Sequence, residues 1–155
     1  MKSKSGTIFL SGLIAGTLDI LAAIFVYVII LEKTTAIKIL QSIASGIFKK
    51  EAYSEGSQMA WYGLGLHYLI AFIFAWFYFT IYPYLPFLKK STIISGFLYG
   101  LFVWIIMNLI ILPIVFPVLP EKHLDFPLLL SITILMLFIG LPIASVTKKY
   151  YSFRN

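Results

Sequence analysis

The sequence predicts an all-α integral membrane protein: a bundle of four helices that cross the bilayer, with one amphipathic helix between the first and second. Two observations carry this prediction. Hydrophobic residues make up 61% of the 155 residues and charged residues only 12%, whereas a soluble domain is about 45–50% apolar and about 25% charged. The apolar residues also gather in four long stretches that charges and prolines separate. We expect residues 1–155 to form one transmembrane domain.

Four stretches are long enough to cross the hydrocarbon core, which takes about 20 residues of helix. The expected spans are residues 7–31, 57–82, 91–114 and 126–147. Glu32 and Lys33 follow the first span, whereas Pro113, Pro117 and Pro120 separate the third from the fourth, because proline interrupts a helix. Aromatic residues near the span ends predict belts at the headgroup layers: Trp61, Tyr62, Tyr78, Tyr82, Tyr84, Tyr150 and Tyr151.

The distribution of lysine and arginine predicts the orientation of the chain. Seven of these residues fall on the side of the N-terminus: Lys2, Lys4, Lys89, Lys90, Lys148, Lys149 and Arg154. Five fall on the opposite side: Lys33, Lys38, Lys49, Lys50 and Lys122. Because basic residues favour the cytoplasmic side of a membrane, we expect both termini to be cytoplasmic.

Residues 35–48 are expected to form the amphipathic helix. At 100° per residue, one face collects the apolar side chains Ala36, Ile37, Ile39, Leu40, Ile43, Ala44, Ile47 and Phe48. The other face collects Lys38, Gln41, Ser42, Ser45 and Lys49. A helix of this length measures about 21 Å, which is too short to cross the bilayer. It therefore either lies on the outer membrane surface or enters the membrane as a re-entrant lid.

Small residues at four-residue spacing mark the faces on which the spans are expected to pack, because helices in lipid associate by close backbone approach. Three spans carry a stripe that runs on to a strongly polar residue: Gly12 and Gly16 with Asp19, Gly63 with His67, and Gly96 and Gly100 with Asn108. These polar groups are therefore expected to face the inside of the bundle. The spelling Ser-Gly-x-x-x-Gly occurs in the first and third spans, either by chance or as the trace of a duplicated hairpin.

Asp19 and His67 are predicted to meet near the middle of the membrane. Asp19 lies about 18 Å from the inner end of its span, and His67 lies about 15 Å from the outer end of its own. A charge at the centre of a span costs about 2.5–3.5 kcal/mol on insertion scales, and a paired histidine would offset that cost. Asn108 would extend this polar site toward Gln41 and Ser42. The alternative is structural, with these side chains only satisfying one another or the nearby backbone.

Several kinds of chemistry are excluded by the composition. The chain has no cysteine, so it has no disulfides, thiolate ligands or cysteine nucleophiles. Two histidines do not make a dedicated transition-metal site, and no phosphate loop or catalytic motif is present. The net charge of +6 comes from short clusters at span ends, which fits lipid headgroups better than nucleic acid. We therefore expect no catalytic residues, no cofactor, no metal and no nucleic-acid partner.

Five segments of this chain carry a resemblance: residues 11–19 with Gly-Thr-Leu-Asp, 39–46 with Leu-Gln-Ser-Ile-Ala-Ser-Gly, 66–72, 107–113 with Met-Asn and Leu-Pro, and 140–144 with Gly-Leu-Pro-Ile-Ala. They resemble a family of short, uncharacterised four-span proteins of the bacterial inner membrane. The resemblance covers nearly the whole chain and implies that location, but it implies no activity, ligand or cofactor. Relatives often have a histidine near the position of Leu135, and its absence here argues against a metal-type role for the fourth span.

The expected function is that of a small transporter, channel or ligand-binding bundle with Asp19, His67 and Asn108 at a buried site. The alternative is a non-catalytic assembly or lipid-interacting protein, in which the same residues only lock the helices together. An intramembrane enzyme ranks last. The lipid bilayer is the expected partner, and the pattern leaves room for a small ligand, a proton or a second copy of the chain bound through a GxxxG face.

Overall fold

The computed structural model describes residues 3–54, 56–116 and 125–152. All of the regular structure in these ranges is helical, and four helices are long and apolar enough to cross a membrane: Lys4–Ile30, Gly56–Tyr84, Thr92–Val115 and Phe126–Ser152. These limits agree with the predicted spans to within a few residues, so the predicted architecture is confirmed. Lys2, Lys122, Arg154, Pro117 and Pro120 lie outside the described residues.

The helices follow one another in two halves. The first half consists of α1 (Lys4–Ile24), η1 (Phe25–Ile30), α2 (Ala36–Phe48), η2 (Lys49–Tyr53), α3 (Gly56–Ile81) and η3 (Tyr82–Tyr84). The second consists of α4 (Pro86–Lys90), α5 (Thr92–Ile105), η4 (Ile106–Ile111), α6 (Leu112–Val115), α7 (Phe126–Ile134), η5 (Leu135–Gly140) and α8 (Leu141–Ser152). Four helices begin at a side-chain cap that accepts a hydrogen bond from the amide three residues on: Ser3, Thr35, Ser91 and Asp125.

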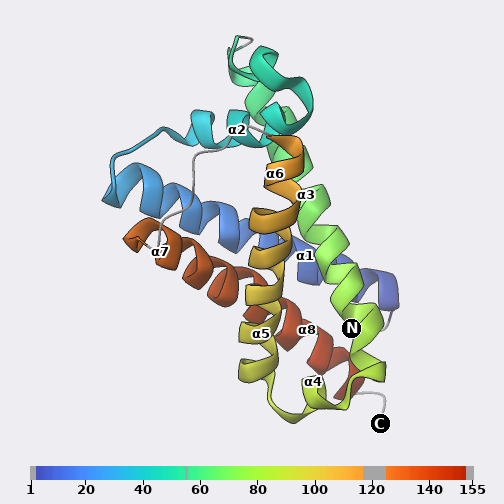
Figure 1. The fold of residues 1–155 in the computed structure, drawn as a ribbon. Coiled ribbons are helices and arrows are strands. Elements are labelled where there is room, and N and C mark those ends of the chain that lie inside the picture. The colour runs from blue at the N-terminus through green and yellow to red at the C-terminus, as the bar shows by residue number, and fades with distance from the viewer. Residues whose placement is uncertain (1–2, 55, 117–124, 153–155) are drawn as a thin grey trace.

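Figure 1 shows how the spans are arranged. The α3 span and the α5–α6 span run up the view, and the α1 span and the α7–α8 span cross it toward the left. The start of α1 and the end of α8 lie toward the same end of the bundle, as an even number of crossings requires, and we call that end the inner end. Between the first and second spans, α2 and η2 lie at the opposite, outer end.

The best-packed core lies toward the inner end and joins all four spans with α4. Its buried residues are Ala15, Ala75, Tyr78, Tyr82, Leu88, Tyr99, Val103, Ile139, Ile143 and Ala144. The rings of Tyr78 and Tyr99 meet edge to face with centroids 4.6 Å apart, a favourable geometry for aromatic pairs. The Tyr99 hydroxyl donates a hydrogen bond to the Phe74 carbonyl at 2.6 Å. This contact ties the inner halves of α3 and α5 together.

The predicted aromatic belts are only partly correct. Trp61 and Tyr84 are 72% and 79% exposed, as residues of a headgroup belt should be. Tyr78, Tyr82 and Tyr150 are buried instead, so their assignment to a belt is wrong. Packing against other rings inside the bundle replaces the headgroup environment for these three side chains.

Of the three π-helical segments in the described part of the chain, two precede a proline. Leu112-Pro113 follows η4, and Leu141-Pro142 follows η5. Proline has no N–H, and its ring clashes with the carbonyl four residues earlier in a regular α-helix. A wider π-helical turn moves that carbonyl, so each span continues past its proline rather than ending there.

The α2 helix packs on the outer half of α3. Its buried residues are Gln41, Ala44 and Ser45. The Leu40 carbonyl comes so close to Gly63 that a side chain at Gly63 would overlap it. By contrast, Ile47 is 61% exposed. The predicted division into a polar and an apolar face therefore fails at Gln41 and Ser45, because close packing on α3 selects small residues and the Gln41 amide finds a backbone acceptor.

Candidate functional site

The candidate site lies where α1 packs against α3. Gly12 and Gly16 allow this close approach, because a side chain at Gly12 would overlap the Phe72 ring and a methyl group at Gly16 would lie 3.0 Å from the Tyr68 ring. The backbone of α1 therefore lies directly against side chains of α3, as small-residue stripes in lipid predict. This brings the polar side chains of α3 within reach of the α1 backbone.

Two hydrogen bonds cross this contact at neighbouring positions. The His67 Nε2 atom lies 2.8 Å from the Gly16 carbonyl oxygen. Because a carbonyl only accepts, the proton of this bond must sit on His67 Nε2. The hydroxyls of Thr17 and Tyr68 lie 2.8 Å apart and form the second bond. Together they fix the rotation of α3 relative to α1 near the middle of both spans.

Asp19 lies three residues after Gly16, in the middle of the first span, and is half-buried. No hydrogen bond or ion pair joins it to His67, although both are described residues and are near enough to interact electrostatically. The predicted buried Asp19–His67 pair is therefore not formed in this structure. The His67 ring is directed at the Gly16 carbonyl, which the missing glycine side chain leaves accessible.

The other predicted site residues lie farther apart. Asn108 is half-buried in η4. The Gln41 amide donates to the Gly56 carbonyl at 2.8 Å and so ties α2 to the start of α3. Ser42 is exposed, and its hydroxyl donates to the Ile39 carbonyl of its own helix at 2.6 Å. The structure therefore gathers two polar bonds and Asp19 at the α1–α3 contact.

The predicted packing glycines all face another helix. Besides Gly12, Gly16 and Gly63, these are Gly96 and Gly100, which pack against the backbone of η5 and α8. Gly140, which was not among the predicted packing residues, lies against Gly96 and Gly100. Both GxxxG faces therefore pack against other helices of the same chain.

Two residues of the site were missed by reasoning from the sequence. Tyr68 was not singled out because tyrosine was expected at span ends rather than in the middle of a span. Thr17 was not singled out either, because a lone threonine in an apolar span commonly bonds to its own helix backbone. The sequence does hold a sign of this contact, because Gly16 and Thr17 are adjacent and so are His67 and Tyr68. Once the two helices align, His67 reaches Gly16 and Tyr68 reaches Thr17.

Within residues 3–54, 56–116 and 125–152, no three histidine, aspartate or glutamate side chains come together as a metal site. Comparisons with known proteins add no family, since no family model, no curated protein and no solved structure matches the chain.

Proposed function

We propose that this polytopic membrane protein is a small ligand-binding or transport protein in which Asp19 binds a proton or a cationic group. The position of Asp19 carries the proposal. It is a half-buried carboxyl group in the middle of an apolar span, and no described residue donates a hydrogen bond to it. A charge placed there costs about 2.5–3.5 kcal/mol on insertion scales. Ionisable residues in spans commonly serve binding or proton transfer for this reason.

His67 supports the proposal as a positioning residue. Its bond to Gly16 holds the α1 backbone one turn from Asp19, and the two side chains interact electrostatically. The π-helical segment η1 follows Asp19 in the same span, and η4 contains Asn108. Such segments are rare and frequently lie at functional sites, since they break the regular backbone ladder. Asn108 remains a proposed member of the site.

The purified chain, reconstituted in liposomes that contain a fluorescent pH dye, provides the test. A potassium gradient with valinomycin imposes a membrane potential, and the rate of proton entry is recorded. In parallel, the melting temperature in nanodiscs is measured with Na⁺, K⁺ and tetramethylammonium. We expect the wild type to admit protons faster than empty liposomes, or to be stabilised by one of the cations, and Asp19→Asn to lose that response.

Thr80→Val is the matched control, because Thr80 lies in the second span and bonds only to the Trp76 carbonyl of its own helix at 2.8 Å. This variant should behave as the wild type in both measurements. If neither proton entry nor stabilisation by any of the three cations depends on Asp19, the proposal is wrong, and a non-catalytic structural role becomes the better account of the polar contact.

A further inference from the structure

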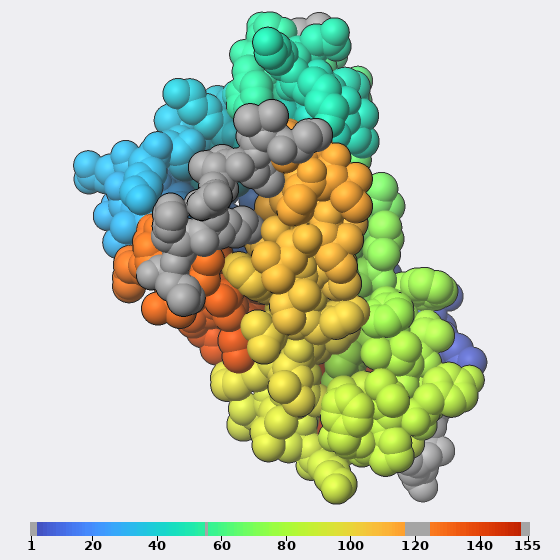
Figure 2. Space-filling model, in the orientation of Figure 1, coloured from blue at the N-terminus to red at the C-terminus, as the bar shows by residue number. Residues whose placement is uncertain are grey.

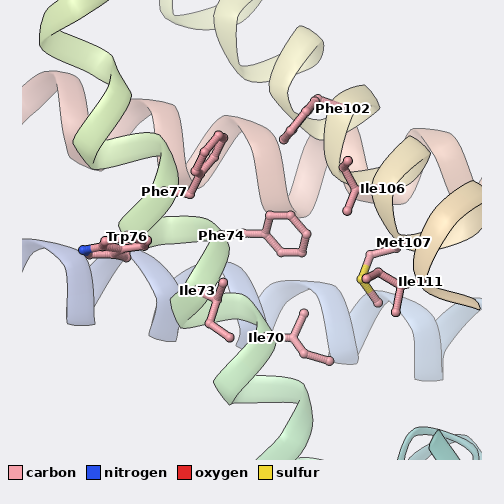
Figure 3. Close-up of a pocket in the computed structure, with 9 residues that line it drawn as sticks. All are labelled: Ile70, Ile73, Phe74, Trp76, Phe77, Phe102, Ile106, Met107 and Ile111. Carbon is pink, nitrogen blue, oxygen red and sulfur yellow. The ribbon is translucent and has the colours of Figure 1, made fainter. Parts of the chain in front are cut away.

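A hollow lined entirely by apolar side chains separates α3 from the α5–η4 run. Its cavity volume is about 360 Å³, and Ile70, Phe74 and Phe77 face Phe102, Met107 and Ile111 across it. Figure 3 shows Phe74 pointing from α3 toward Met107 on the opposite wall. Phe77 and Phe102 stack with centroids 5.8 Å apart at the inner end of this hollow. Farther out, the two helices do not pack closely.

The hollow continues toward both ends of the bundle. At the inner end, a cavity of about 260 Å³ shares Phe77 and Phe102 with it. At the outer end, a cavity of about 360 Å³ shares Ile70, Met107 and Ile111 with it. We call these hollows, together with the outermost one described next, the α3–α5 groove. Between Phe102 and Val115 the groove follows about 20 Å of helix, at about 1.5 Å per residue.

The outermost hollow, of about 610 Å³, changes the chemistry of the groove. It shares Val115 and Phe116 with the apolar part, and its other walls include Lys49, Lys50 and the hydroxyl-bearing Tyr53. Figure 2 shows the residues of η2 above the outer end of the α5–α6 run. The groove is therefore apolar along the membrane and cationic at its outer mouth.

The charge at this mouth is not neutralised within the described part of the chain. The Lys49 ammonium donates to the carbonyls of Val115 at 2.8 Å and of Gly46 at 3.3 Å, at the ends of α6 and α2. The partial negative charge at a helix C-terminus holds such a cation in place and offsets only part of its charge. Lys50 is exposed, and among the described residues neither lysine has a carboxylate partner. One ammonium is thus fixed beside the mouth, and a second is exposed next to it.

We propose that the α3–α5 groove holds an acyl chain of an anionic phospholipid whose phosphate lies at Lys49 and Lys50. The apolar walls exclude a polar ligand from the membrane-embedded part, and the two ammonium groups complement a phosphate at the depth where headgroups begin. The Tyr53 hydroxyl lies beside them and donates a hydrogen bond to Ser45 Oγ at 3.4 Å, so it adds an acceptor-lined polar edge but no free donor. The proposal does not involve Asp19, so it stands or falls independently of the proposed function.

Native mass spectrometry of the full chain, delipidated in a nonionic detergent, provides the test. Dioleoyl phosphatidylglycerol and dioleoyl phosphatidylcholine are titrated separately, and the fraction of lipid-bound protein is measured. We expect the wild type to bind phosphatidylglycerol more tightly. Lys50→Gln should weaken the binding of phosphatidylglycerol about fivefold, which corresponds to the attraction of one lysine for an anionic surface. The binding of phosphatidylcholine should stay unchanged.

Ile111→Trp tests the apolar part, since Ile111 lines both the first hollow and the apolar cavity at its outer end and is 39% exposed. This variant should weaken the binding of both lipids. Leu109→Trp is its matched control, because Leu109 is also exposed in η4 but does not line the groove. Lys38→Gln is the control for charge on the same side of the membrane.

Three outcomes would overturn the proposal. Equal binding of the two lipids would remove the role of the lysines. Lipid binding that neither Lys50→Gln nor Ile111→Trp reduces would place the lipid elsewhere. A dimer that Ile111→Trp dissociates without any change in lipid binding would make the groove a contact between two copies of the chain.

Discussion

The first two spans and the last two spans form hairpins that use the same motif in different ways. In the first hairpin, Gly12 and Gly16 of α1 face the side chains of α3. In the second, Gly96 and Gly100 of α5 face the backbone of η5 and α8, with Gly140 directly against both and the Leu141 side chain also close to Gly96. The first helix of each hairpin carries Ser-Gly-x-x-x-Gly. The motif therefore allows the close approach, and the partner helix determines whether side chains or backbone lie against the glycines.

The polar content of the two contacts differs accordingly. The first hairpin holds the His67–Gly16 and Thr17–Tyr68 hydrogen bonds, with Asp19 beside them. At the glycines of the second hairpin, backbone meets backbone. We infer that the second hairpin is the rigid scaffold and that the first carries the candidate site. A duplicated hairpin remains a prediction.

The sharpest test of this comparison is a methyl group added to each glycine contact. In Gly140→Ala the new methyl would overlap the Gly96 backbone, which cannot move away, so we expect a loss of about 3 kcal/mol or more in unfolding free energy. Gly16→Ala meets the Tyr68 ring at 3.0 Å, and this side chain can shift, so we expect a loss of about 1 kcal/mol. Titration with SDS in mixed micelles measures both. Equal losses would remove the distinction between the hairpins.

Removing the histidine should have the next largest effect. His67→Leu deletes the bond to the Gly16 carbonyl, and we expect a loss of about 1–2 kcal/mol, at the upper end for an interhelical bond in a membrane protein. Ser131→Ala is the control in the second hairpin, because it removes the acceptor of the Trp104 indole bond, which measures 2.9 Å. A larger loss for Ser131→Ala than for His67→Leu would contradict our view that the first hairpin depends more on its polar contacts.

Tyr68→Phe should have a smaller effect. It removes one hydroxyl from the bond with Thr17 and keeps the ring that packs on Gly16. The average interhelical hydrogen bond suggests a loss of about 0.6 kcal/mol. The same titration with SDS measures this loss, and Thr17→Val is expected to lose about as much unfolding free energy as Tyr68→Phe. If Tyr68→Phe instead equals the loss of His67→Leu, the two neighbouring bonds act as one unit.

The smallest effect expected is the interaction energy between Asp19 and His67. They share no hydrogen bond but interact electrostatically, so a double-mutant cycle with Asp19→Asn and His67→Leu should give an interaction of about 0.5 kcal/mol. A value near that of a buried ion pair, about 3–5 kcal/mol, would mean that the two side chains pair directly in the membrane. Additive losses would mean that Asp19 acts independently of the histidine.

The spans were predictable because lipid imposes a minimum length of apolar helix, which hydropathy detects directly. The partners of the polar residues were not, because they depend on how each helix is rotated about its own axis. Small-residue stripes show which face of a helix packs, but they do not show which residue of the neighbouring helix each polar side chain reaches. His67 was expected to reach Asp19 and instead reaches the Gly16 carbonyl, three residues earlier. For the same reason, the buried side of α2 includes Gln41 and Ser45.

The π-helical turn in the fourth span has a consequence for the phase of the helix. Ile134 and Ile139 are both buried, although a separation of five residues in a regular α-helix would point them about 140° apart. The wider turn of η5 takes up one extra residue and so restores the alignment. The helical stretches before and after it therefore bury the same face of the span. Deleting one residue between Leu135 and Gly140 would return this segment to a regular α-helix with Ile134 and Ile139 four residues apart, so Ile143 and Ala144 would stay in the core. The Pro142 ring would then again meet the carbonyl four residues before it. The wider turn therefore admits one extra residue, and the proline that follows it, without changing which side chains of the fourth span face inward.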